Sequence, residues 1–334
     1  MITVVLGGEY GSEGKGSIVS WLAKNNAYDL VIRTGGTNAG HTFKGRNGEL
    51  FKMRQLPCSW AFQNTPIYIP AGAVVDLDIL EKEAKLVREN GYTGQIHVSP
   101  YSAVISSENR NAEEEIETGT TGAGVGATRA KKCLRKAELV KDFYEAVGFT
   151  NSQVQVQHLL KSKIKNILIE ATQGYGLSLD GSRYPYVTSA NLDTYRILSD
   201  AEIPFGVHQV QVWLVLRAFP IRIAGNSGYL FNETSWAELR KAYGEHIPDE
   251  QTTVTKKTRR VGEFDPTLAK EAVVRCGANV IVLTFVDYVF PNVKETGVTA
   301  EIDHWLCHLE GKAGLHFDYL GIGTGELVPR LYSR

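Results

Sequence analysis

The chain has 334 residues, of which 43% are hydrophobic and 22% charged, and a formal net charge of −1 at pH 7. Such values are ordinary for a globular protein with a sizeable core. The balance of 36 basic and 37 acidic side chains lacks the basic excess of a nucleic-acid binder, so we expect no nucleic-acid partner. No apolar run has the length of a membrane span or the form of a secretory signal, so we expect no membrane partner and a cytoplasmic location.

The chain opens with a strand over Ile2–Leu6, a glycine-rich turn, a helix over about Gly16–Lys24 and a strand over Asp29–Arg33. A strand–loop–helix–strand unit is typical of a parallel sheet. Further strands are predicted at Ile67–Ile69, Ile96–Ser99, Asn166–Glu170, Val210–Ala218 and Val280–Phe285. Helices are predicted at Asp78–Asn90, Lys136–Val147, Ser189–Leu198, Ser235–Tyr243 and Pro266–Cys276. The pattern predicts one α/β domain over residues 1–334 with a large, mostly parallel central sheet.

Two polar stretches, Ser106–Lys132 and Glu245–Glu263, are predicted as long loops. Loops of that length in a compact enzyme are commonly binding loops or lids, which makes them candidate active-site loops. Plain disorder is the alternative interpretation of the same composition.

The segment Gly7–Ser17 follows the first strand and precedes the first helix. Its glycines let the backbone turn tightly and aim N–H groups at an anion, and the helix adds its positive end. Lys15 supplies a full charge for phosphates. The spacing departs from a strict Walker A motif, because Glu9 stands where that motif needs glycine and Gly16 where it needs Ser or Thr. We therefore predict a P-loop-like nucleotide-binding fold of variant geometry, with an ordinary glycine-rich turn as the alternative.

The segment Arg33–Thr42 follows the second strand and carries His41 between the small residues Gly40 and Thr42. A lone histidine is more often structural than catalytic. With little bulk around it, however, an imidazole here could protonate or stabilise a developing oxyanion.

Further hydroxyl and amide groups suit a second phosphate-bearing ligand. Thr120 and Thr121 lie in the Gly-rich segment Gly119–Gly126, which could bind phosphate or serve only as a flexible linker. Gln173 could contact a base edge through its amide. Thr188 could bind phosphate or merely cap the helix that follows.

The segment Thr252–Gly262 interleaves hydroxyl groups with cations and could clamp a carboxylate or phosphate, although a solvated charge run is the alternative. Two segments suited to bind phosphate, Gly7–Ser17 and Gly119–Gly126, and the separate cationic segment Thr252–Gly262 suggest the ligands of one site. These would be a triphosphate, a nucleoside monophosphate and an acid. That combination points to a ligase driven by ATP or GTP.

Taken together, these motifs resemble those of the adenylosuccinate synthetase family. The resemblance extends from the first strand to about Asp287. Five segments carry the resemblance in the family's order: Gly11–Gly16, Asn38–Thr42, Gly119–Gly122, Tyr184–Ser189 and Arg259–Gly262. In that family the γ-phosphoryl group passes to O6 of the purine, and the amine of aspartate then displaces it.

The resemblance implies a role for each matching residue. It implies catalytic roles for Ser12, Lys15 and His41, the last by stabilising charge on O6. Residues implied to bind the triphosphate are Gly11, Glu13, Gly14, Lys15, Gly16, Ser17, Gly40, His41, Thr42 and Asp287. Those implied to bind the monophosphate are Ser12, Asn38, Thr120, Thr121, Arg135, Gln173 and Thr188, with Arg135 donated by the partner in a homodimer. Aspartate would be bound by Thr255, Lys257 and Arg259. The implied cofactor is Mg²⁺, held by the Gly40 carbonyl, with Ser12 as a second candidate.

Position 12 departs from the family, which has an Asp there that removes the N1 proton of IMP. Ser12 is no equivalent base, but it leaves room for a 2-amino group and can accept a hydrogen bond from it. This change resembles the bacteriophage-type 2-aminoadenylosuccinate synthetases, which join dGMP to L-aspartate for diaminopurine DNA. A phage-encoded enzyme would act in the host cytoplasm.

The donor segment also departs from the family pattern Thr-Lys-x-Asp, since Phe285 replaces the Lys. The resemblance therefore favours ATP or dATP over GTP. One alternative is an ordinary adenylosuccinate synthetase that acts on IMP with GTP. An alternative of another class is a catalytically silent nucleotide-binding protein, which only the loss of the Asp at position 12 favours.

Overall fold

The computed structural model describes residues 1–334 except 115–117, 144–164, 205, 207–208, 253–256 and 331–334. The described residues form a nine-stranded central sheet in the order β16-β15-β14-β10-β1-β9-β2-β5-β7. Neighbouring strands are parallel except β15 and β16. The strands are β1 (Ile2–Gly7), β2 (Leu30–Arg33), β5 (Ile67–Ile69), β7 (Ile96–Val98), β9 (Ile167–Gly174), β10 (Val210–Arg217), β14 (Val280–Thr284), β15 (Tyr319–Gly321) and β16 (Leu327–Pro329). The predicted α/β class and mostly parallel sheet are confirmed.

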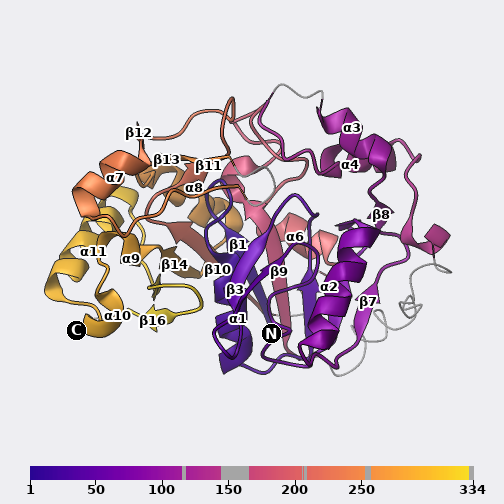
Figure 1. The fold of residues 1–334 in the computed structure, drawn as a ribbon, viewed down its shortest axis with the longest axis horizontal. Coiled ribbons are helices and arrows are strands. Elements are labelled where there is room, and N and C mark those ends of the chain that lie inside the picture. The colour runs from indigo at the N-terminus through magenta and orange to yellow at the C-terminus, as the bar shows by residue number, and fades with distance from the viewer. Residues whose placement is uncertain (115–117, 144–164, 205, 207–208, 253–256, 331–334) are drawn as a thin grey trace.

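Two hydrophobic cores cover the two faces of this sheet. On β1, Val4 belongs to one core and its neighbour Val5 to the other, because successive side chains of a strand point to opposite faces. The core with Val5 includes residues of α1 (Lys15–Asn25), α2 (Leu77–Glu89) and the hairpin of β3 (His41–Lys44) and β4 (Leu50–Met53). The core with Val4 includes residues of α6 (Thr194–Asp200), α8 (Pro266–Cys276) and α11 (Ala300–Ala313). Figure 1 shows α2 and β3 in front of the sheet strands.

Clear end signals explain why several helices were predictable. The α8 helix has the predicted bounds: Asp265 caps its start, Pro266 stands at its first position, and Gly277 ends it in a left-handed conformation. The helix α7 (Trp236–Tyr243) begins at a capping box formed by Ser235 and Glu238.

Shorter elements surround the central sheet. The remaining strands are β6 (Val74–Val75), β8 (Ala103–Val104), β11 (Ile221–Arg222), β12 (Glu233–Thr234) and β13 (Arg260–Gly262). The remaining helices are α3 (Ser107–Glu114), α4 (Val125–Cys133), α9 (Val286–Val289), α10 (Val293–Thr296) and the 3₁₀ turns Val140–Phe143 and Tyr175–Leu177.

The helix predicted over Lys136–Val147 is wrong in its described part. The backbone there pairs with β8 instead: the amide of Val104 donates to the Glu138 carbonyl, and the amide of Val140 donates to the Ser102 carbonyl. Only the short 3₁₀ turn follows, and residues 144–147 lie outside the described residues. Pairing with a distant strand therefore overrides local helix propensity.

The predicted loop Ser106–Lys132 contains two helices, α3 and α4, so that prediction is also wrong. Glu113 of α3 explains why a glycine-rich sequence becomes helical there. Its carboxylate accepts hydrogen bonds from the amides of Gly124 (2.8 Å) and Gly126 (2.5 Å), at the start of α4. A carboxylate at that position satisfies the free N–H groups of a helix start.

Two other boundaries shift. The helix predicted from Ser189 begins only at Thr194, because Asp193 caps it by accepting a hydrogen bond from the amide of Arg196. The stretch predicted as a loop over Glu245–Glu263 contains the short strand β13 near its end.

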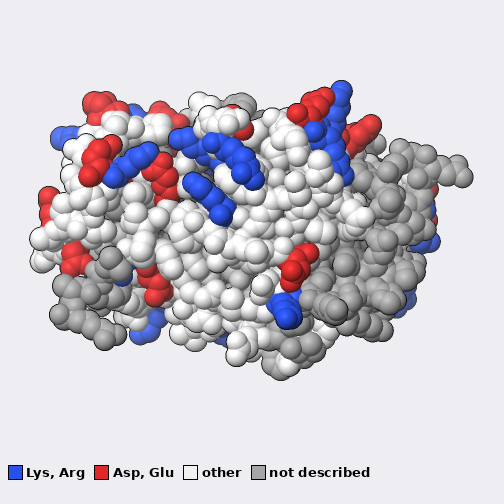
Figure 2. Space-filling model, turned by 90° about the horizontal axis from the view of Figure 1, so that it is seen from below, with Lys and Arg blue, Asp and Glu red and all other residues white. Residues whose placement is uncertain are grey.

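None of the described helices is long and apolar enough to cross a membrane. Figure 2 shows acidic side chains among the basic ones on the face that it displays.

Candidate active site

A cavity of about 400 Å³ lies where the loops after β1, β2 and β9 meet. In open α/β sheets, ligands bind outside the carboxyl ends of the strands. The cavity is lined by twelve of the residues predicted to bind substrates: Gly11, Ser12, Lys15, Asn38, Gly40, His41, Thr120, Thr121, Gln173, Thr188, Lys257 and Arg259. Five segments far apart in the sequence thus meet at one site.

The other predicted residues lie elsewhere. Those outside the cavity lining are Glu13, Gly14, Gly16, Ser17, Thr42, Arg135 and Asp287. Thr255 lies outside the described residues. Arg135 is exposed just beyond the end of α4 and does not reach the cavity of its own chain.

The backbone of the first loop is shaped like an anion cradle. Gly11, Ser12 and Gly14 all have left-handed backbone conformations, with φ of 88°, 61° and 84°. Successive residues of this kind turn backbone N–H groups toward a common point, and the start of α1 adds its unpaired amides. The Nζ of Lys15 lies 2.6 Å from Glu13 Oε2. An anion bound here would therefore meet backbone donors and a buried, oriented ammonium group.

Glu13 supports this loop from inside. Its side chain is fully buried, and Oε1 accepts hydrogen bonds from the amides of Glu9 (3.1 Å) and Gly11 (2.8 Å). Gly7 and Gly174 make room for it, since a Cβ on either would collide with the carboxylate. Glu13 is thus directed into the loop, away from the cavity.

Close packing explains why Gly16 replaces the Ser or Thr of a Walker motif. A Cβ at this position would lie 2.9 Å from the Thr42 carbonyl oxygen and 3.0 Å from Cys58 Sγ. Real Cβ contacts that short are strained, so glycine lets α1 pack directly on β3.

His41 is held by a buried ionic network. Its Nδ1 lies 2.5 Å from Glu170 Oε1, which also accepts a hydrogen bond from Arg33 at 2.5 Å. Glu170 Oε2 accepts the amide of Cys58 at 2.7 Å. Burial lowers the pKa of His41 to about 3, helped by the charge of Arg33 and opposed by Glu170. The ring is therefore neutral at pH 7, and its Nδ1 lies within hydrogen-bond distance of both Glu170 Oε1 and, at 2.6 Å, the Arg33 guanidinium.

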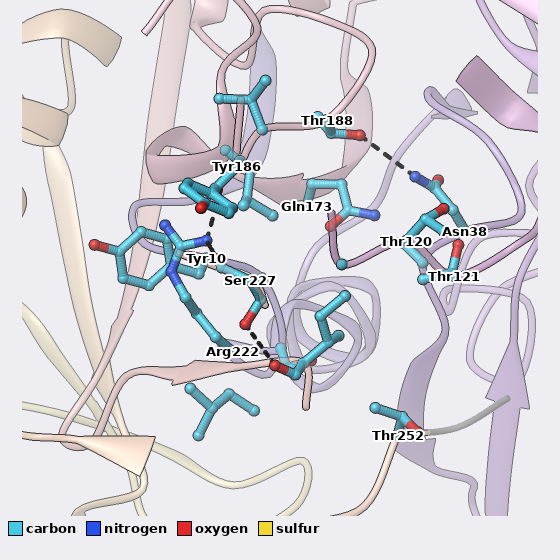
Figure 3. Close-up of a pocket in the computed structure, with 18 of the residues that line it drawn as sticks. Tyr10, Asn38, Thr120, Thr121, Gln173, Tyr186, Thr188, Arg222, Ser227 and Thr252 are labelled. Atoms are coloured by element: carbon cyan, nitrogen blue, oxygen red, sulfur yellow. Dashed lines mark hydrogen bonds between the residues drawn. The ribbon is translucent and has the colours of Figure 1, made fainter. Parts of the chain in front are cut away.

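Hydroxyl and amide groups gather at one end of the cavity. Figure 3 shows Asn38, Thr120 and Thr121 close together, with Thr188 facing Asn38. The Nδ2 of Asn38 donates to Thr188 Oγ1 at 3.4 Å. Because Asp193 caps the next helix, Thr188 is not a helix cap and its hydroxyl faces the cavity.

The sequence of the chain matches a known protein family. The model of the family described as "Adenylosuccinate synthetase" matches residues 4–161 and 148–303. The chain belongs to the adenylosuccinate synthetase family. The synthetase is therefore a carbon–nitrogen ligase that joins aspartate to a purine nucleotide, driven by a nucleoside triphosphate.

Several relatives share much of the chain. The adenylosuccinate synthetase of Thermococcus sibiricus is 34% identical over 295 residues, which cover 85% of this chain and 83% of the relative. That of Methanocaldococcus jannaschii is 33% identical over 296 residues, which cover 85% of this chain and 82% of the relative.

Solved structures agree with the fold. The succinoaminodeoxyadenylate synthetase of cyanophage S-2L, bound to dGMP and dATP, has a TM-score of 0.84 and 25% identity, covering 98% of this chain and 95% of its own. The fully ligated adenylosuccinate synthetase of Plasmodium falciparum shares the fold, with a TM-score of 0.81 and 18% identity. The match covers 98% of this chain and 99% of the Plasmodium chain.

The synthetase also places in the cavity residues that motif analysis missed. The guanidinium of Arg222 lies 3.8 Å from the centre of the Tyr10 ring and donates to the carbonyls of Tyr229 and Ser227. Figure 3 shows Tyr10, Tyr186 and Arg222 grouped across Gln173 from the threonines. A wall with aromatic faces suits a purine or sugar. The available signal was that Tyr10 and Arg222 each follow a predicted apolar strand, Ile2–Leu6 and Val210–Ala218, by four residues.

Ser12 is joined to the clamp segment of the synthetase. Its hydroxyl Oγ accepts a hydrogen bond from Arg259, and its carbonyl accepts one from Arg217 at 3.0 Å. Arg217 is fully buried, pairs with Glu250 at 2.5 Å, and lies 3.9 Å from the centre of the Phe285 ring. Position 12 is therefore fixed by two cations, one from β10 and one from the stretch before β13.

Proposed function

We propose that the synthetase joins L-aspartate to C6 of dGMP, using ATP or dATP, to make 2-amino-2′-deoxyadenylosuccinate for diaminopurine nucleotides. Ser12 carries this proposal. Its exposed side chain lines the cavity, and Oγ accepts one hydrogen bond, from Arg259. A hydroxyl oxygen has two lone pairs, so one is left for the 2-amino group of guanine. The likeness to the cyanophage enzyme bound to dGMP and dATP supports the same interpretation.

The residues fit a two-step reaction. O6 of the purine attacks the γ-phosphorus as N1 gives up its proton to water, the bond to the β-phosphate oxygen breaks, and a nucleoside diphosphate leaves. Lys15 and the loop amides bind the phosphate charge, while His41, which lines the cavity, stabilises the negative charge at O6 by donating a hydrogen bond from Nε2. The aspartate amine then attacks C6, and inorganic phosphate leaves with O6.

Thr120, Thr121, Asn38 and Thr188 bind the monophosphate in this proposal, and Gln173 contacts the nucleotide. Lys257 and Arg259 bind the carboxylates of aspartate, together with Thr255. Arg135, which is exposed and does not line the cavity of its own chain, serves a partner subunit of a homodimer in this proposal.

Magnesium fits the site as an ion carried by the donor phosphates. Gly40 lines the cavity and offers its carbonyl, while Ser12 Oγ already faces a guanidinium and is a poor second ligand. Glu13 is held by Lys15 and two amides. Since Mg²⁺ commonly takes phosphate oxygens and water with few protein ligands, Gly40 suffices. When bound, the ion would neutralise charge on the donor phosphates.

The donor proposal depends on Phe285. Its ring stacks under Arg217, so the position holds no cation of its own to contact a base. Asp287 is half-buried nearby, and burial raises its pKa. The loss of a cation at position 285 is what favours ATP or dATP over GTP in this proposal.

The second candidate is an ordinary adenylosuccinate synthetase that acts on IMP with GTP. The names of the relatives from Thermococcus and Methanocaldococcus favour it.

A crossed assay separates the two. Phosphate release is measured with IMP, GMP or dGMP against ATP, dATP or GTP, with and without aspartate. The proposal expects the highest kcat/KM for dGMP with ATP or dATP, and no release without aspartate. Equal or faster turnover of IMP would refute it and favour the second candidate.

A further inference from the structure

Arg54 lines the same cavity, yet it belongs to none of the motifs that pointed to the site. It follows directly after β4 and is partly buried. Its surroundings indicate a function that depends on its charge.

The backbone at Arg54 is held rigidly. The carboxylate of Glu83, on α2, accepts hydrogen bonds from three successive amides: Arg54 (2.6 Å), Gln55 (3.0 Å) and Leu56 (2.7 Å). The Nε of Arg54 donates to the carbonyl of Thr37 at 2.8 Å. The guanidinium is thereby attached to the residue that precedes Asn38.

The charge of Arg54 is not compensated by a direct ion pair. Within the described residues, the Thr37 carbonyl is the only acceptor for its side chain. The nearest carboxylates are occupied: Glu83 by the three amides, and Asp76 by Arg110 at 2.6 Å. Burial lowers the pKa of Arg54, because it disfavours an uncompensated cation. A partly buried guanidinium with unused donors is a good anion ligand.

Three other cations that line the cavity already have partners, and the fourth, Lys257, is exposed and belongs to the proposed aspartate clamp. Lys15 pairs with Glu13, Arg222 binds carbonyls and stacks on Tyr10, and Arg259 binds Ser12. Among these, the guanidinium of Arg54 has its terminal donors free.

The position of Arg54 favours contact with the monophosphate over contact with the triphosphate. Arg54 is bonded beside Asn38, and Asn38 contacts Thr188. Both belong to the proposed monophosphate site, whereas the triphosphate loop lies at Gly11–Lys15. We propose that Arg54 binds the 5′-phosphate of the purine monophosphate from within the same subunit. This inference rests on the proposed monophosphate site, but it holds whether the base is guanine or hypoxanthine.

Three variants test it: Arg54→Gln removes the charge, Arg54→Lys keeps it, and Arg110→Gln is the matched control. Arg110 belongs to the same acid–base cluster but pairs with Asp76 and does not line the cavity. We measure KM for dGMP, ATP and aspartate, and the inhibition constant of deoxyguanosine, which lacks the phosphate. If the wild type uses IMP, the same assays use IMP and inosine.

We expect Arg54→Gln to raise the KM of the monophosphate about 10–100-fold, the range for a lost charge-assisted hydrogen bond. The KM values of donor and aspartate and the inhibition by the nucleoside should stay within about twofold. The KM of Arg54→Lys for the monophosphate should lie between those of the wild type and Arg54→Gln. The KM of Arg110→Gln should match that of the wild type.

Three results would overturn the proposal and indicate a structural role for Arg54. They are equal weakening of nucleoside and nucleotide binding, a similar rise in all three KM values, or the same rise in the KM of the monophosphate in Arg110→Gln. If Arg54→Gln does not fold by circular dichroism, Arg54→Lys decides: a higher KM for the monophosphate with unchanged inhibition by the nucleoside supports the proposal, and an unchanged KM or an equal weakening of both refutes it. Absence of turnover by the wild type with every purine monophosphate would instead refute the proposed function.

Discussion

Ser12→Asp changes the residue that we expect to distinguish dGMP from IMP. Ser12 has φ of 61°, a left-handed conformation that Asp adopts more readily than most residues. The side chain is exposed to the cavity, so we expect the variant to fold. Its new carboxylate would lie beside Arg259, which donates to Ser12 Oγ in the unmodified chain.

The expected size of the effect follows from the hydrogen bond to the 2-amino group. The larger carboxylate would pair with Arg259 and occupy the space that this group needs, so the bond is lost or the base is displaced. Leaving a buried donor unpaired costs about 1–3 kcal/mol. That corresponds to about 5–150-fold in kcat/KM at room temperature. IMP has no 2-amino group, so its kcat/KM should not fall.

The assay compares kcat/KM for dGMP and IMP under saturating aspartate and donor. We expect the dGMP-to-IMP ratio to fall at least about tenfold in Ser12→Asp. Ser12→Asn, with the size of Asp but no charge, separates crowding from charge, and Ser12→Ala removes the hydroxyl without adding volume. A ratio unchanged within about twofold in Ser12→Asp would show that position 12 does not select the purine.

Other predictions concern the buried network and the phosphate end of the cavity. Glu170→Gln leaves Arg33 without its buried carboxylate, so we expect urea denaturation to show about 3–5 kcal/mol lower stability; a loss under 1 kcal/mol would contradict this. Because the pKa of His41 is lowered to about 3, stability should fall as the pH drops from about 6.5 toward 3, and His41→Gln should lack this component in acid titrations followed by circular dichroism. Thr188→Val should raise the KM of the monophosphate about 10-fold and leave that of ATP unchanged, whereas an equal rise in both would indicate a general distortion.

Local signals made much of the fold predictable. Short apolar runs marked seven strands of the central sheet but not β15 and β16, and the predicted bounds of α8 match the structure. Prediction failed where distant contacts decide the backbone. Residues near Val140 pair with the loop before β8, and Glu113 stabilises the start of α4 from outside that helix.

The sequence by itself determined the chemistry of the motifs: a glycine-rich loop with Lys15, the small residues around His41, and a serine at position 12. Local composition suffices there, because left-handed turns need glycine and phosphates need cations. Only the tertiary structure decided that Glu13 faces into its own loop and that Arg54 reaches the cavity without a carboxylate partner. Burial and unpaired charge depend on residues brought together from distant strands, which no local sequence pattern specifies.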